Sequence, residues 1–132
     1  MKTTSIALIF AAAAAAQQAD IKYEQFPATG IACPNSDASG NLISNTADLK
    51  AAALAARNKT PIESSAANIS SGKCSGLRGV PYYSTEAYQT NGELAGSLSF
   101  AYDEASQTIY YCLAQGLYST NGSGYPDSCE AI

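Results

Sequence analysis

Four cysteines, Cys33, Cys74, Cys112 and Cys129, are the feature that most limits how this chain of 132 residues can fold. An even number of cysteines in a small secreted chain is typical of disulfide bonds, and four cysteines allow three pairings. They form no CxxC motif and the chain has no His, so a zinc site would need all four thiolates. We therefore expect two disulfides, each contributing about 4 kcal/mol by restricting the unfolded chain.

The N-terminus has the pattern of a secretion signal. Lys2 is followed by an unbroken apolar run over residues 6–16, which is too short to cross a bilayer as a helix. We expect a signal peptide over residues 1–16, with cleavage after Ala19 as the alternative, and one secreted domain over residues 17–132. The other interpretation of the apolar run is a buried helix. We expect an extracellular monomer without a membrane partner.

The composition excludes several kinds of chemistry. Without His there is no Ser/His/Asp triad, no Cys/His dyad and no His-ligated metal, so proton transfer would depend on carboxylates, Tyr, Lys or Arg. Loss of the signal peptide removes Lys2 and leaves six Lys or Arg against eleven Asp or Glu, a net charge of −5. Proteins that bind phosphate backbones by charge are usually basic, which counts against strong non-specific nucleic-acid binding. We expect no metal and no cofactor.

Three glycosylation sequons begin at Asn58, Asn68 and Asn121. All three lie in polar, turn-rich stretches where a glycan fits. Such triplets also arise by chance, and then they carry no glycan.

The first half of the domain predicts one strand and one helix. Residues 21–26 alternate between apolar and polar and predict a short strand, and residues 27–40 predict a loop that carries Cys33. Asn45 can cap a helix that runs to Arg57, and Pro61 follows its end. One face of this helix combines Leu49, Ala52, Ala53 and Ala56. Small side chains on this face favour close packing on a sheet.

The second half has the character of a β-sheet. Residues 62–79 predict a loop with one strand near Cys74, and after them residues 80–88, 94–102 and 107–114 predict strands. Asn91-Gly92 is a strong turn signal between the first two of these strands. One helix followed by antiparallel strands predicts an α+β domain.

The order of these parts resembles the secreted fungal guanyl- and purine-preferring ribonucleases. The resemblance is carried by residues 100–112 (FAYDEASQTIYYC), by the loop and Ala-rich helix after Cys33, and by the Gly/Ser/Asn-rich ending before Cys129. It implies one α-helix packed on a central antiparallel β-sheet. It also implies that cysteines tie the N-terminal region to the C-terminus, with Cys33–Cys129 and Cys74–Cys112 as the pairs.

The catalytic residues of that family do not carry over. The family uses a carboxylate or His base, a His acid and an Arg that stabilises the phosphate. Ser99 stands where the resemblance expects the Arg, Gln115 is the nearest polar residue to the expected His, and Glu86 is the nearest candidate base. We expect no catalytic residue and no enzymatic activity. The chain then resembles the inactive ribonuclease-like effectors of plant-pathogenic fungi, which are virulence proteins. This resemblance implies that the protein binds a host protein or RNA, inside or around host cells after its secretion.

Tyrosines are the main binding candidates. Tyr82-Tyr83 and Tyr110-Tyr111 are adjacent pairs whose members point to opposite faces of a sheet, so we expect one of each pair outside the core. These rings can stack on bases or contact a protein, or they pack as ordinary sheet residues. Arg78, close to Cys74, can contact a phosphate, or it is simply a solvated charge.

Two other functions stay open. One is a secreted, disulfide-stabilised structural or antimicrobial domain unrelated to ribonucleases, although antimicrobial modules are usually basic. The other is an active hydrolase that uses carboxylates, with Glu86 or Asp103 as the base, which would need two carboxylates close together. Asp103 and Glu104 are adjacent, but they lie beside a predicted turn, where solvated side chains are usual.

Overall fold

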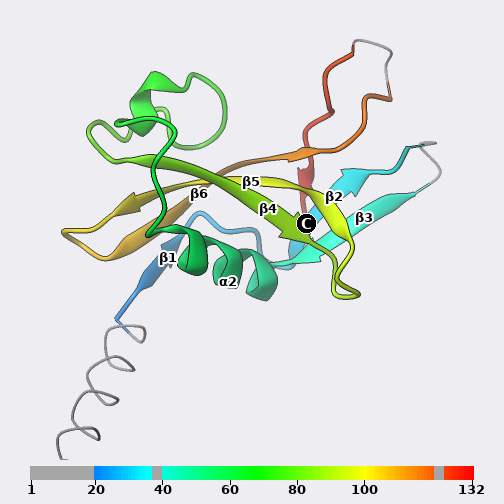
Figure 1. The fold of residues 1–132 in the computed structure, drawn as a ribbon, viewed down its shortest axis with the longest axis horizontal. Helices are drawn as coiled ribbons and strands as arrows, with labels where there is room; N and C mark the ends of the chain where they lie inside the picture. Colours follow the sequence, from blue (N-terminus) through cyan, green and yellow to red (C-terminus); the bar gives the residue numbers. More distant parts are fainter. Residues whose placement is uncertain (1–19, 37–39, 121–123) are drawn as a thin grey trace, which may run out of the picture.

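The fold is described from a computed structural model that covers residues 20–36, 40–120 and 124–132. The predicted signal peptide (1–16) and the sequon at Asn121 lie outside these residues. The elements are, in chain order, β1 (Lys22–Glu24), β2 (Gly30–Pro34), β3 (Asn41–Asn45), α2 (Thr46–Ala56), the 3₁₀ turn η1 (Ala66–Asn68), β4 (Tyr82–Tyr88), β5 (Leu94–Asp103), β6 (Thr108–Gly116) and β7 (Glu130–Ala131) (Figure 1). The predicted α+β class and both disulfide pairs are confirmed.

The main sheet has four strands in the order β1-β6-β5-β4. The three predicted C-terminal strands pair antiparallel, and Gly92 takes a positive φ of 88° in the predicted turn between β4 and β5. The expectation of a wholly antiparallel sheet is wrong, because β1 pairs parallel with β6. No hairpin joins these two strands, so their relative direction is free of the constraint that a short turn imposes.

A second sheet has three strands in the order β3-β2-β7. The predicted loop over residues 27–40 is wrong for β2, which pairs with β3 on one side and with the C-terminal β7 on the other. Gly30 permits this pairing, since a Cβ at this position would lie 2.3 Å from the carbonyl oxygen of Ser44. The Cys33–Cys129 disulfide joins β2 to the C-terminal segment, with the two Cα atoms 4.3 Å apart.

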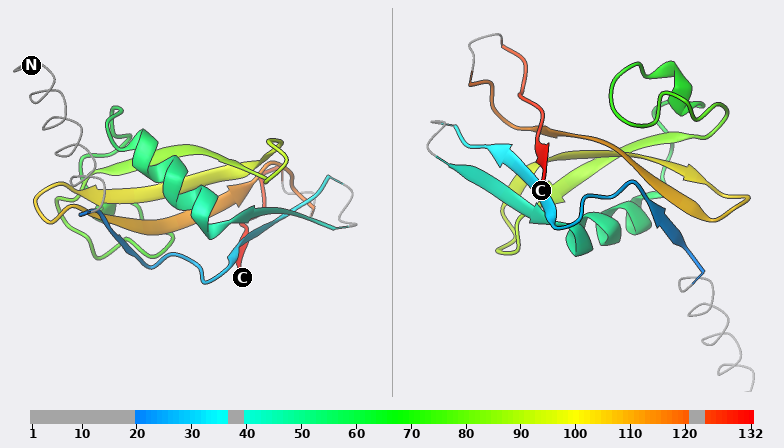
Figure 2. Two further views of the ribbon diagram at one scale, coloured as in Figure 1. Left: turned by 90° about the horizontal axis from the view of Figure 1, so that it is seen from below. Right: turned by 180° about the vertical axis from the view of Figure 1, so that it is seen from behind.

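The helix α2 begins where the sequence predicts. The side chain of Asn45 accepts a hydrogen bond of 2.8 Å from the backbone N–H of Asp48, which satisfies one of the free donors of the first turn. The buried face carries Leu49, Ala53 and Ala56. Figure 2 shows α2 lying across one face of the main sheet, where its small residues pack against β4.

The main core lies between α2 and the sheet. Leu98, Phe100, Ile109 and Tyr111 project into it from β5 and β6, and the ring of Tyr83 stacks on that of Phe100 with 5.1 Å between centroids. Because side chains alternate along a strand, the residues between these point to the other face. We call that other face, opposite α2, the outer face.

The segment over residues 62–81 covers one end of the outer face. Ala66 and Cys74 pack there with Tyr82, Ala101 and Cys112 of the sheet in a second buried cluster. The expected strand near Cys74 is not formed; the Cys74–Cys112 disulfide joins a loop to β6, where we expected it to join two strands. The segment pairs with the sheet through the bridge between Glu63 and Tyr82 and through the N–H of Lys73, which donates to the carbonyl oxygen of Cys112 at 2.8 Å beside the disulfide.

Candidate functional site

The three positions that the resemblance associates with catalysis lie on the outer face. Glu86 of β4 is in register with Ser97 of β5, and Ser97 is in register with Gln115 of β6. Ser99 lies two residues beyond Ser97 on the same strand and therefore on the same face. Residues up to 29 positions apart in the sequence thus form one continuous row across three strands, which we call the outer-face row (Glu86, Ser97 and Gln115).

The chemistry of the outer-face row is that of a hydrogen-bonding surface. Glu86 and Gln115 are exposed and Ser97 is half-buried. The hydroxyl of Tyr88 donates a hydrogen bond to Glu86 Oε2, and this bond is the main reason that the pKa of Tyr88 is raised above 10.0. The row therefore offers one carboxylate, one hydroxyl and one amide, with a tyrosine ring beside them.

The expectation for the first tyrosine pair is wrong. Tyr82 and Tyr83 point to opposite faces, but both are buried, at 3% and 8% exposure. The reason is that both faces of β4 are covered at this end, one by α2 and the other by the segment over residues 62–81. In the second pair Tyr111 is buried and Tyr110 is half-buried against the second cluster. Arg78 is exposed on the covering segment.

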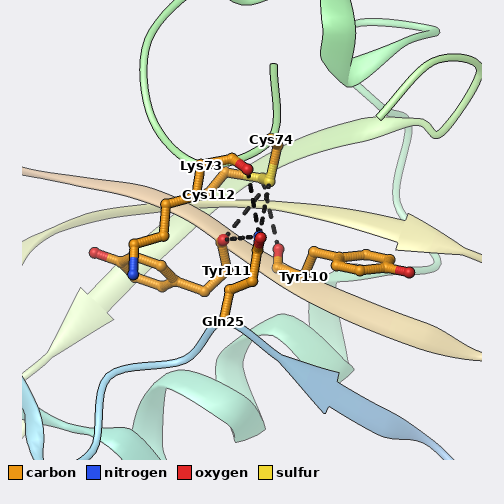
Figure 3. The surroundings of a disulfide bond; sticks show 6 residues. All are labelled: Gln25, Lys73, Cys74, Tyr110, Tyr111 and Cys112. Carbon is orange, nitrogen blue, oxygen red and sulfur yellow. Dashed lines mark hydrogen bonds between the residues drawn. A yellow bond between two sulfur atoms is a disulfide. The ribbon is translucent and has the colours of Figure 1, made fainter. Parts of the chain in front are cut away.

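Gln25 joins three parts of the chain beside the Cys74–Cys112 disulfide (Figure 3). Its Nε2 donates to the carbonyl oxygen of Tyr111 at 3.1 Å and approaches that of Lys73 at 3.4 Å. The backbone of Gln25 has a positive φ of 67°, which is uncommon for a residue other than Gly, Asn or Asp. Nothing in the local sequence pattern marks Gln25, since its partners lie 48 and 86 positions away.

A pocket of about 470 Å³ lies beside the C-terminal end of α2, at the end of the main sheet where β4 begins and β5 ends. One part of its lining comes from the residues after α2, and another comes from the end of β5 and the turn to β6. The lining residues are Ile21, Arg57, Asn58, Lys59, Pro81, Tyr83, Tyr102, Glu104 and Gln107. Glu86, Ser99 and Gln115 are not among them, so the expected site and the pocket are separate places.

The polar groups of the pocket interact with one another. The guanidinium of Arg57 lies 5.8 Å from the centroid of the Tyr102 ring and donates to the carbonyl oxygen of Leu54. Burial raises the pKa of Tyr83 above 10.0, and the charge of Glu104 and then Tyr102 raise it further. The phenol of Tyr83 therefore stays protonated at neutral pH and can donate a hydrogen bond into the pocket.

Only part of this pocket was predictable from the amino-acid sequence. Tyr83 was a binding candidate and Asn58 a glycosylation candidate, whereas Arg57, Lys59 and Gln107 were not singled out. The available signal was the run Arg57-Asn58-Lys59 directly after an Ala-rich helix. This run shows a polar helix end, but no spacing rule connects it to the β5–β6 turn that completes the lining.

The expected carboxylate pair does not form a site. Asp103 Oδ1 accepts a hydrogen bond of 3.2 Å from the backbone N–H of Ala105 and so stabilises the β5–β6 turn. Glu104 lines the pocket, where it is the one carboxylate among the lining residues. Asp103 therefore stabilises the turn, whereas its neighbour Glu104 lines the pocket.

Within residues 20–36, 40–120 and 124–132, no group of three or more His, Cys, Asp or Glu is placed to hold a metal ion. The same part of the chain contains no helix that is both long enough and apolar enough to span a membrane. All four cysteines are paired in the two disulfides.

The chain matches no protein-family model, and neither a curated protein nor a solved structure matches it. Function is therefore inferred from the residues and their placement.

Proposed function

We propose that the protein is a secreted, ribonuclease-like fungal effector that has no catalytic activity and acts by binding a host protein through the outer face. The observation that carries this proposal is the outer-face row, in which Glu86, Ser97 and Gln115 are in register across three strands. The resemblance assigned the base and the acid of the ribonucleases to two of these positions from sequence layout alone. Their meeting on one face supports the ribonuclease-like layout.

The same row supports the loss of the reaction. Gln115 cannot donate a proton as a general acid, and Ser99 has no charge with which to stabilise a phosphate. Loss of general acid–base catalysis costs about 10²- to 10⁴-fold in rate, and loss of charge stabilisation costs about 10²- to 10³-fold more. Together these losses remove most of the rate acceleration that such an enzyme provides.

A protein partner is favoured over RNA by the charge of the chain. The domain is acidic overall, and the outer-face row itself carries the negative Glu86. RNA would be repelled by this face, because its backbone is negatively charged. Tyr88, beside Glu86, is 44% exposed, and tyrosines, which have an apolar ring and a polar end, are enriched in protein interfaces.

The two alternative functions receive less support. A two-carboxylate hydrolase needs both groups in one site, whereas the outer-face row and the pocket each contribute one carboxylate. A structural or antimicrobial function would not explain why Glu86 and Gln115 are aligned on one face.

The catalytic part of the proposal is tested by an RNA cleavage assay with the purified, oxidised protein. We expect no cleavage by the wild type and measurable cleavage by the double variant Ser99→Arg/Gln115→His, which replaces the missing charge and acid. The matched control is Ser99→Arg/Gln89→His, in which the His is placed after β4. Cleavage by the wild type at a rate near that of the fungal ribonucleases would overturn the proposal.

The binding part is tested by capturing host proteins with the wild type and with charge-reversal variants. We expect Glu86→Lys to lose the captured partner, and Glu93→Lys, which reverses a carboxylate in the β4–β5 turn, to keep it. Fluorescence anisotropy with single-stranded RNA at physiological salt should show no binding. If the protein instead binds RNA with a micromolar Kd and Glu86→Lys strengthens this binding, the partner is RNA and not a protein.

A further inference from the structure

The pocket at the end of α2 has a lining that the proposed function does not use. It lies on the α2 side of the sheet, since Tyr83 and Tyr102 pack with the main core and not with the second cluster. Two cations, Arg57 and Lys59, come from the residues that follow α2. One carboxylate, Glu104, comes from the β5–β6 turn. The lining therefore has an excess of one positive charge in a chain whose net charge is negative.

Both polar sides of the pocket are held in place by backbone hydrogen bonds. The N–H of Lys59 donates to the carbonyl oxygen of Ala56 at 3.0 Å, which closes a turn directly after α2. The N–H of Gln107 donates to the carbonyl oxygen of Glu104 at 3.2 Å and closes the β5–β6 turn. Lys59 and Glu104 are exposed, but the backbone that carries them is fixed.

Gln107 adopts a left-handed conformation with φ of 53°. A residue other than Gly, Asn or Asp is uncommon in this region. This conformation occurs at a residue that lines the pocket. Gln107 therefore both closes the β5–β6 turn and lines the pocket.

The lining determines the chemical class of ligand. A volume of about 470 Å³ is within the usual range for small-molecule sites. The amides of Asn58 and Gln107 and the phenols can both donate and accept hydrogen bonds, which suits hydroxyl groups. Arg57 keeps free N–H donors besides the one that it gives to Leu54, and these suit an anionic group.

We propose that this pocket binds a small, hydroxyl-rich anion of the size of a sugar acid or a sugar phosphate. The anionic group contacts Arg57 and Lys59, and the hydroxyl groups hydrogen-bond to Glu104, Gln107 and the phenols. An apolar ligand would leave these polar groups without partners, which costs binding energy. The carboxylate and the phosphate have the same recognition chemistry, and the experiment distinguishes them.

The test uses isothermal titration calorimetry and NMR chemical-shift mapping with three probes: glucuronate, glucose 6-phosphate and neutral glucose. The protein is produced without N-glycans, because Asn58 begins a predicted sequon and lines the pocket. We expect at least one anion to bind with a millimolar or tighter Kd and to shift the signals of Tyr83, Tyr102 and Gln107. We expect glucose to bind about tenfold more weakly, and the anion's affinity to fall with added salt.

The decisive variant is Lys59→Gln, which removes an exposed charge and leaves the contacts of Arg57 intact. We expect it to weaken the anion about tenfold, the effect of one charge-assisted hydrogen bond. Lys73→Gln, an exposed lysine outside the pocket, is the matched control and should change nothing. Thermal unfolding confirms that both variants fold.

Whichever anion binds more tightly identifies the acidic group, and either result supports the proposal. Absence of binding by both anions overturns it. Equal binding of glucose and the anions overturns it as well, as does an affinity that Lys59→Gln leaves unchanged. None of these results affects the proposed function, because the outer face is a separate surface.

Discussion

Removal of the Cys74–Cys112 disulfide should release the segment over residues 62–81 before it unfolds the domain. The perturbation is the double variant Cys74→Ala/Cys112→Ala. The two cysteines are 38 positions apart, and the chain-entropy model gives about 3.9 kcal/mol for a loop of this size. The same model gives about 4.7 kcal/mol for Cys33–Cys129, whose separation is 96. Small domains are stable by about 5–15 kcal/mol, so either loss is large.

The two disulfides differ in the backbone pairing of the segments that they join. Around Cys33 the strand β2 is paired on both sides, so the backbone stays attached without the disulfide. Around Cys74 the direct attachments are the bond from Lys73 N–H to the carbonyl oxygen of Cys112, at 2.8 Å, and the bonds of Gln25. Without the disulfide the segment is held mainly by the second buried cluster, so local opening would expose Tyr82 and Ala101 and leave the main core intact.

Amide hydrogen exchange and urea unfolding measure the two effects separately. We expect urea unfolding to show a loss of about 4 kcal/mol for either double variant. In Cys74→Ala/Cys112→Ala the amide of Lys73 should also become less protected than that of Leu98, which lies in the core of β5. In Cys33→Ala/Cys129→Ala the two amides should keep their relative order.

Two results would refute this reasoning. If Lys73 and Leu98 lose protection equally in Cys74→Ala/Cys112→Ala, the segment does not open independently of the sheet. If the free energy of unfolding falls by less than about 1 kcal/mol, loop closure is not what the disulfide contributes. Circular dichroism of the helix signal serves as a control that the rest of the domain is folded.

Three further predictions concern stability. Asn45→Ala should cost about 1 kcal/mol in urea unfolding, because Asp48 N–H loses its acceptor, whereas Asn45→Asp should cost little; equal losses would contradict the cap. Among the described residues, Ser44 Oγ is the buried side-chain atom that lacks a hydrogen-bond partner, so Ser44→Ala should gain up to about 1 kcal/mol, and a loss of that size would show that a partner exists. Burial raises the pKa of Tyr111 above 10.0, so its stabilisation is complete below pH 10 and is lost as pH rises through the native pKa; urea unfolding at pH 8–11 should show this slope, and Tyr111→Phe should reduce it.

The regular elements with strong local signals were predictable from sequence. Asn45 and the Ala-rich face marked α2, and the alternating residues on both sides of Asn91-Gly92 marked β4 and β5. These signals are local because a helix turn and a hairpin turn each involve neighbouring residues. The elements without such a signal, β2, β3 and β7, are short strands of the second sheet, in which β2 pairs with the neighbouring β3 and with β7 at the far end of the chain.

The candidate site was predictable to a similar degree. The order of sequence segments matched Glu86 and Gln115 to catalytic groups of the ribonucleases, and the register of the strands puts both residues in one row. The pocket was not predictable as a unit, since Arg57 and Glu104 come from different elements. The burial of Tyr82 also depended on a distant segment, which no alternation pattern describes.

The sequence by itself determined that this is an α+β chain with two disulfides and no histidine chemistry, because composition, helix caps and hairpin turns act over a few residues. Only the tertiary structure decided which faces of the sheet are covered and which polar groups meet. A strand's alternation says that Tyr82 and Tyr83 lie on opposite sides, but not what lies against each side. That depends on contacts between distant segments, such as the one that the Cys74–Cys112 disulfide holds against the sheet.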